Sequence, residues 1–144
     1  MASSDTHTRP CSVVIFRLKN AGLRPTRQRI ALAKLLLASD NRHVTAEALH
    51  EEAKNAGVSV SLATVYNALH QFTDAGLMRE VVVDSGRSFF DTNTSDHHHF
   101  FHEDIGRIED IPNDQVRVSQ LPNAPAGTTV SRVDVIVRVS GLAN

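Results

Sequence analysis

The spacing of the apolar residues changes from a helical period to a strand period near residue 78, and this change restricts the possible folds more than any other feature. Two β-rich runs, at residues 79–83 and 87–91, flank Asp84-Ser85-Gly86, a sequence that predicts a hairpin. Before them, helical patterns with plausible N-caps at Thr26, Thr45 and Ser61 cover residues 12–20, 26–38, 45–57 and 61–77. The first part of the chain is therefore expected to be a group of helices followed by a hairpin.

This order of elements is that of a winged helix-turn-helix domain, which we expect over residues 12–91. In such a domain the last helix enters the major groove of DNA and the hairpin lies against the DNA backbone. Residues 1–11 are rich in Ser, Thr and His and are expected to form a flexible N-terminal arm.

The rest of the chain is expected to form a small dimerisation and effector-sensing domain over residues 97–144, after a turn-rich hinge at residues 92–96. We predict a strand at residues 105–111, a short helix at 114–121 and a long strand with an apolar valine face at 130–139. A unit of this size buries little surface by itself, so its valine face is expected to pack partly against a second copy of the chain. The predicted fold class is α+β.

The charges are segregated along the chain, although the net charge is only −1. Seven basic residues and no acidic residue lie between Arg9 and Lys34, whereas acids outnumber bases seven to four from Thr92 onward. A basic first half is suited to phosphate, so double-stranded DNA is the expected partner.

Several classes of protein are disfavoured by the sequence. No stretch approaches the roughly 18 consecutive apolar residues that a membrane span needs, and a cytoplasmic location is expected. The single cysteine, Cys11, excludes an internal disulfide and is expected to be a bystander. We find no nucleophile elbow, phosphate loop or His-Glu-x-x-His motif, and therefore do not expect an enzyme. Passive storage of haem or metal would leave the basic half without a purpose.

The fourth helical pattern carries the side chains of a DNA-reading helix. With Leu62, Val65 and Leu69 turned inward, it exposes on one face Ser61, Thr64, Asn67 and Gln71, with Tyr66 and His70 beside them. Asn and Gln can hydrogen-bond the edge of adenine, and Thr and Tyr can contact a thymine methyl group. An ordinary amphipathic helix with a solvated polar face would show the same pattern.

The chain resembles the ferric uptake regulator superfamily in four motifs, in order and spacing. They are Leu18-Lys19-Asn20-Ala21-Gly22-Leu23-Arg24-Pro25-Thr26-Arg27-Gln28-Arg29, His43-Val44-Thr45-Ala46-Glu47, Ala63-Thr64-Val65-Tyr66-Asn67 and Phe72-Thr73-Asp74-Ala75-Gly76-Leu77. The resemblance implies a dimeric regulator that binds an inverted-repeat operator, with Tyr66 on the bases and Arg24 and Arg29 on the minor groove or backbone. Asn67 stands where iron and zinc sensors usually carry Arg, so a different operator is expected. The candidate DNA-binding residues are Arg24, Arg27, Arg29, Ser61, Thr64, Tyr66 and Asn67.

A histidine cluster follows the predicted hinge, since four of the eight histidines lie within residues 97–102. In an extended segment His97 and His99 would point one way and His98 the other. Imidazole can ligate haem, and Phe100 and Phe101 would suit a porphyrin face. The triple histidine, the missing cysteine pairs and Asn67 resemble the iron response regulators, and this resemblance implies haem held by His97, His98 and His99 that lowers DNA binding. A solvated histidine-rich loop is the alternative without function.

A divalent cation is the rival effector. By the same resemblance, Fe²⁺, Mn²⁺ or Zn²⁺ could be held by His43, Asp91, His99 and Glu103, and the chain would then be a metal-dependent repressor. Asp110 matches another carboxylate position of the family, but the histidine expected with it falls at Val133 or a neighbour.

Overall fold

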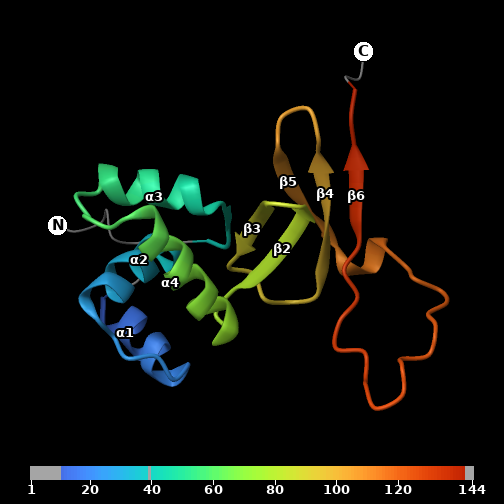
Figure 1. The fold of residues 1–144 in the computed structure, drawn as a ribbon, viewed down its shortest axis with the longest axis horizontal. Helices are drawn as coiled ribbons and strands as arrows, with labels where there is room; N and C mark the ends of the chain where they lie inside the picture. Colours follow the sequence, from blue (N-terminus) through green and yellow to red (C-terminus); the bar gives the residue numbers. More distant parts are fainter. Residues whose placement is uncertain (1–10, 39, 142–144) are drawn as a thin grey trace. The chain divides into compact units, whose positions relative to one another are not determined.

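The computed structural model describes residues 11–38 and 40–141, which form two compact units divided between Thr94 and Ser95 (Figure 1). This division falls inside the segment predicted as a hinge. The predicted N-terminal arm lies outside the described residues except for Cys11, which is exposed and begins the first helix. Within the described ranges, no helix has the length and apolar character needed to cross a membrane.

Unit 1 (residues 1–94) contains the four predicted helices. Their observed bounds are α1 (Cys11–Asn20), α2 (Arg27–Leu37), α3 (Ala46–Asn55) and α4 (Leu62–Asp74). The three predicted N-caps are confirmed, because the side-chain oxygens of Thr26, Thr45 and Ser61 accept the backbone N–H of Arg29, Ala48 and Thr64 at 3.3, 3.1 and 3.0 Å.

The helix ends also follow from the sequence. After α4, Gly76 adopts φ +84°, a conformation that costs an L side chain energy, and this lets the N–H of Leu77 bond to the carbonyl of Phe72 at 2.9 Å.

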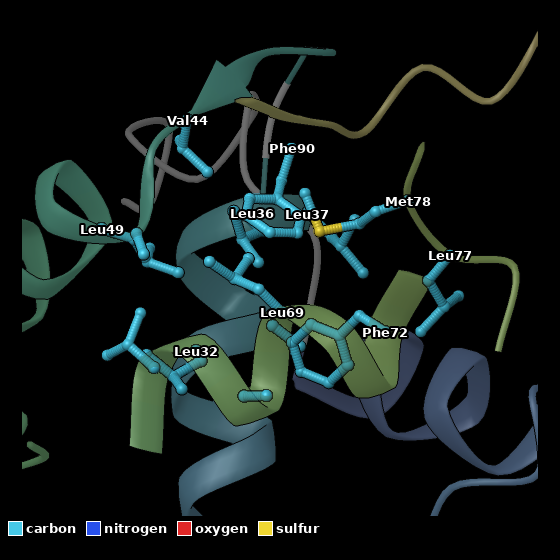
Figure 2. Close-up of a cluster of buried hydrophobic side chains, with 14 of the residues drawn as sticks. Leu32, Leu36, Leu37, Val44, Leu49, Leu69, Phe72, Leu77, Met78 and Phe90 are labelled. Carbon is cyan, nitrogen blue, oxygen red and sulfur yellow. The ribbon is translucent and has the colours of Figure 1, made fainter. Parts of the chain in front are cut away.

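The core of unit 1 joins the inward faces of its helices. Leu32 and Leu36 of α2, and Leu69 and Phe72 of α4, are almost completely buried. Figure 2 shows these side chains gathered with Phe90 of the hairpin. The predicted helical period is thus confirmed, and the buried faces leave the opposite face of α4 available for other contacts.

The hairpin consists of β2 (Arg79–Asp84) and β3 (Arg87–Asp91), as predicted, and a third strand, β1 (His43–Val44), joins it in the order β1-β3-β2. Strand β1 was not predicted, because two residues are too few to show a period. It pairs His43 directly with Asp91.

Unit 2 (residues 95–144) contains a sheet of three strands. Its central strand is β4 (His97–His102), which pairs antiparallel with β5 (Arg107–Pro112) and parallel with β6 (Ile136–Val139). Phe101, Ile108 and Ile111 are buried in this unit. The chain between β5 and β6 follows a long irregular path (Figure 1).

Two predictions in unit 2 are wrong. The helix expected at residues 114–121 is only a 3-10 turn at Asn113–Gln115, and the strand expected at 130–139 is regular only from Ile136. Val116 and Val118 lie two apart, and such a pair cannot share a helix face. Val118 and Val130 are 45% and 56% exposed, so burial of these side chains contributes little to the stability of their segments.

Candidate DNA interface and metal-ligand clusters

The exposed face of α4 borders a polar cavity in unit 1. The cavity has a volume of about 490 Å³ and is lined by Arg24, Thr26, Gln28, Arg29, Thr64, Asn67, Ala68 and Gln71. Four of the predicted DNA-binding residues, Arg24, Arg29, Thr64 and Asn67, therefore lie around one concave surface. Guanidinium groups beside amide and hydroxyl side chains can bind phosphate and base edges together.

Arg29 has a fixed orientation on this surface. Its Nε and Nη2 atoms donate to Oε1 of Gln71 at 3.2 and 3.0 Å, and its Nη1 donates to the carbonyl of Arg24 at 2.9 Å. The sequence identified Gln71 as a base-reading side chain, but here its carbonyl oxygen holds an arginine. A pattern along one helix cannot reveal this contact, because the two residues lie 42 positions apart.

Arg27 and Ser61 occupy different surroundings from the four residues above. Arg27 lines a second cavity on α2 with Lys34 and apolar side chains that include Ile30 and Leu35. Ser61 caps α4, and its hydroxyl also donates to Oγ1 of Thr64 at 2.9 Å. The structure thus brings neither residue into the polar cavity.

Tyr66 lies beside the cavity-lining residues of α4 and contacts α3. Its hydroxyl donates a hydrogen bond of 2.9 Å to Oε2 of Glu47, and its ring stacks on His70 with 6.5 Å between centroids. The hydrogen bond to Glu47, then partial burial, then the negative charge of Glu47 raise the pKa of Tyr66 above its ordinary value. No pattern in the sequence links Glu47 to Tyr66, because the two residues lie 19 positions apart on different helices.

A first cluster of possible metal ligands lies in unit 1, at the edge where β1 pairs with β3. Nε2 of His43 lies 3.4 Å from Oδ2 of Asp91. The Asp91 side chain is only 1% exposed, and its Oδ1 accepts the backbone N–H of Asn93 at 2.8 Å. Burying a carboxylate without partners costs free energy, so the fold stabilises Asp91 by these contacts.

A second cluster lies in unit 2 and combines two histidines of β4 with an aspartate of β5. His97 and His99 point to the same side of the strand, and their Nε2 atoms lie 3.4 and 3.3 Å from Oδ1 of Asp110. The two imidazole rings are 4.6 Å apart, and one ligand atom from each of the three residues lies within 4.8 Å of the others. Both histidines are buried.

A hydrogen bond from Nδ1 of His97 orients its imidazole ring, so that Nε2 faces Asp110. Nδ1 of His97 lies 2.7 Å from the carbonyl oxygen of Ser95, which can only accept, so Nδ1 carries the proton. In the neutral ring, Nε2 then presents a lone pair to the carboxylate of Asp110. Two acceptors face each other favourably only across a proton or a cation, and an imidazole oriented in this way is typical of metal ligands.

His98 and Glu103 lie apart from this cluster. Nδ1 of His98 accepts the backbone N–H of Val135 at 3.1 Å, on the side toward β6. The carboxylate of Glu103 pairs with Arg138 at 3.3 Å. Asp110 pairs directly with His99 in the β4–β5 register, so its carboxylate, and not that of Glu103, lies beside the two histidines.

The sequence model of the Ferric uptake regulator family matches residues 20–137. The ferric uptake regulation proteins of Shigella flexneri and Escherichia coli K12 are each 36% identical to this chain over 104 residues, which cover 72% of this chain and 70% of either relative.

Solved structures agree with the sequence match. The ferric uptake regulator from Pseudomonas aeruginosa with manganese has a TM-score of 0.69 and 27% identity, and the match covers 90% of this chain and 98% of that one. The regulator from Vibrio cholerae, at 24% identity with a TM-score of 0.69, shares the fold over 88% of this chain and 98% of its own. The chain therefore belongs to the ferric uptake regulator family.

Proposed function

We propose that this chain is a transcription regulator, not an enzyme, which binds inverted-repeat operator DNA as a homodimer and binds it more tightly when a divalent cation is present. The observation that carries the proposal is the convergence of His97, His99 and Asp110 in unit 2. Membership of the ferric uptake regulator family supports the link between such a site and DNA binding.

The proposed cation is held by His97, His99 and Asp110 of unit 2, whose ligand atoms converge. His43 and Asp91 of unit 1 are a second candidate pair of ligands, as the resemblance to the family implies. A cation bound by unit 2 would stabilise one conformation of that unit, and a regulator whose DNA affinity depends on that conformation would respond to the cation.

Iron(II), manganese(II) and zinc are the proposed cations. Imidazole nitrogens and carboxylate oxygens are donors that suit all three, and neither cluster contains a thiolate that would favour copper(I). The relative from Pseudomonas aeruginosa was solved with manganese. Mn²⁺ is therefore the practical probe, because it does not oxidise in air as Fe²⁺ does.

The proposed DNA contacts use the surface around the polar cavity. Thr64, Tyr66 and Asn67 would contact base edges, while Arg24 and Arg29 would contact the backbone or the minor groove. Arg27 and Ser61 would contribute phosphate contacts at the margin of this surface. A dimer would present two such helices to successive major grooves, about 34 to 36 Å apart.

The proposed dimer forms through unit 2. Val118, Leu121 and Val130 are 45%, 49% and 56% exposed, although they are apolar. A second copy that covers them would bury this surface and pack against the segments between β5 and β6.

Haem is the alternative effector, expected from the resemblance to the iron response regulators. It would be ligated within His97, His98 and His99 and would lower DNA binding. The geometry supports it less well, because His98 accepts a backbone bond on the other side of β4. Phe101, expected to pack on a porphyrin, is fully buried and lies 5.4 Å from the Arg138 guanidinium.

The test is a DNA-binding titration on duplexes selected by the protein from a random pool. Binding is measured with Mn²⁺, with a chelator and with haem, for the wild-type chain and for His99→Ala. Tight binding that requires Mn²⁺ and is lost in His99→Ala is expected. His102→Ala is the matched control, because His102 lies on the same strand but pairs with Glu109.

Two results would overturn the cation proposal. Operator binding that is equally tight in chelator would exclude a cation requirement. Binding that is abolished by stoichiometric haem, with a histidine-ligated haem spectrum that His99→Ala removes, would establish the alternative effector in its place.

A further inference from the structure

The contact between Glu47 and Tyr66 places an acidic side chain beside a surface that should receive phosphate. Glu47 lies in the first turn of α3, and its Oε2 accepts the Tyr66 hydroxyl at 2.9 Å. A carboxylate so close to DNA weakens binding to every sequence, because it repels phosphate. Glu47 therefore does not improve the affinity for DNA in general. We look for its role in the discrimination between DNA sequences.

The direction of this hydrogen bond fixes what Tyr66 can offer to a base. A carboxylate has no proton to give, so the phenolic proton points to Glu47. The hydrogen bond to Glu47 raises the pKa of Tyr66, so the phenol keeps its proton. With its proton committed, the phenolic oxygen has only lone pairs left to present.

Two further contacts hold the Tyr66 ring in place. The ring stacks on His70 at an interplanar angle of 18°. His70 in turn meets Phe90 edge to face, with 5.4 Å between centroids, and Phe90 is buried in the core of unit 1. The position of the phenolic oxygen is thus fixed by packing that extends to the core of unit 1, as a specific contact with a base requires.

We propose that Glu47 determines base specificity by holding the Tyr66 hydroxyl as a hydrogen-bond acceptor. In the major groove an acceptor matches the exocyclic amine of adenine or cytosine, and it conflicts with the carbonyl oxygen of thymine or guanine. This inference rests on the proposed DNA-binding function. Glu47 is a positioning residue in it, and Tyr66 makes the contact.

The experiment removes the exocyclic amine from the contacted base and, separately, the Tyr66 hydroxyl acceptor or the Glu47 carboxylate from the protein. Single base-pair substitutions are first made in a selected duplex. They locate the base pair whose substitution weakens binding of the wild type but not of Tyr66→Phe. The amine-bearing base there is then replaced by its analogue without the amine, purine for adenine or 2-pyrimidinone for cytosine. Affinities are measured in Mn²⁺ for wild type, Glu47→Gln, Tyr66→Phe and the double variant, after circular dichroism confirms that each is folded.

The expected result is a loss specific to the amine. Removing it should weaken wild-type binding about five- to tenfold, the usual effect of one hydrogen bond. In Glu47→Gln, whose amide can either donate or accept, and in Tyr66→Phe, the loss should fall below about twofold. The double variant should show no further change, because both substitutions remove the same contact.

Glu51→Gln is the matched control for charge. Glu51 is exposed, lies one turn after Glu47 on the same helix and pairs with Lys54 at 3.9 Å, whereas the Tyr66 hydroxyl bonds to Glu47. Its substitution should leave the amine-dependent loss intact. If Glu47→Gln merely raises affinity for all duplexes, as Glu51→Gln would, and keeps the full amine-dependent loss, Glu47 acts only as a charge and the inference is overturned. Failure of the wild type to select any duplex would instead overturn the proposed function itself.

Discussion

Unit 1 and unit 2 differ in where their apolar side chains find partners. In unit 1 the faces of α2 and α4 are covered by one another and by α1, so Leu32, Leu69 and Phe72 are buried within one chain. Among the described residues of unit 2 the buried apolar side chains are Phe101, Ile108 and Ile111, while Val118, Leu121 and Val130 are exposed. An apolar pattern therefore predicts structure reliably where the same chain supplies the covering surface, as it does in unit 1.

The largest effect is expected from a substitution in the core of unit 1, which is formed within one chain. Phe72→Ala should lower the free energy of unfolding by about 3 to 5 kcal/mol, because it leaves a cavity between α4 and α2. Urea denaturation followed by far-UV circular dichroism measures it. Phe16→Ala is the control, since Phe16 lies on α1 with 66% of its surface exposed and should cost under about 1 kcal/mol. Equal losses in the two variants would contradict the assignment of the core.

The next effect concerns unit 2, whose stability should depend on what it binds. Mn²⁺ at about 100 times its dissociation constant should stabilise the wild type by about 2.7 kcal/mol. Asp110→Asn should lose most of this gain, because it removes the charge that faces His97 and His99. Thermal melts with and without Mn²⁺ measure the gain, and Asp114→Asn, an exposed carboxylate on the 3-10 turn, should retain it. An undiminished gain in Asp110→Asn would place the cation elsewhere.

Most of unit 1 could be predicted from the sequence, because each helix carries its own apolar period and α2, α3 and α4 carry an N-cap. Strand β1 could not, since a two-residue strand has no pattern, and its pairing of His43 with Asp91 is a tertiary contact. In unit 2 the prediction of a helix at residues 114–121 was wrong. Its apolar residues Val116 and Val118 lie two positions apart and would face opposite sides of a helix.

The candidate sites divide in the same manner. The alternation along β4 predicted that His97 and His99 share a side, and the structure confirms it. The choice of Asp110 over Glu103 depends on the β4–β5 register, which the turn at residues 103–106 sets. Contacts between distant elements, such as Gln71 with Arg29 and Glu47 with Tyr66, leave no local signal.

A smaller effect is expected at the polar cavity, where one tertiary contact orients an arginine. Gln71→Ala should weaken operator binding about three- to tenfold, because the Arg29 guanidinium loses two hydrogen bonds and the orientation they impose. Fluorescence anisotropy with labelled duplex measures it. Gln28→Ala removes the same amide from another wall of the same cavity and should change affinity less than twofold. If both variants lose the same affinity, the amides contact DNA directly and the positioning role of Gln71 is refuted.

The smallest effect separates two roles of Ser61. As the N-cap of α4 its side chain accepts the N–H of Thr64, so Ser61→Ala should lower the free energy of unfolding by about 1 kcal/mol. Ser61→Asp should keep the cap, because an aspartate accepts the same bond and its charge suits a helix N-terminus. If Ser61 also contacts phosphate, Ser61→Asp should bind operator less tightly than Ser61→Ala, although it is the more stable variant. Urea denaturation measures the stability of both variants, and fluorescence anisotropy measures their affinity for DNA. Equal DNA affinities would restrict Ser61 to its role as an N-cap.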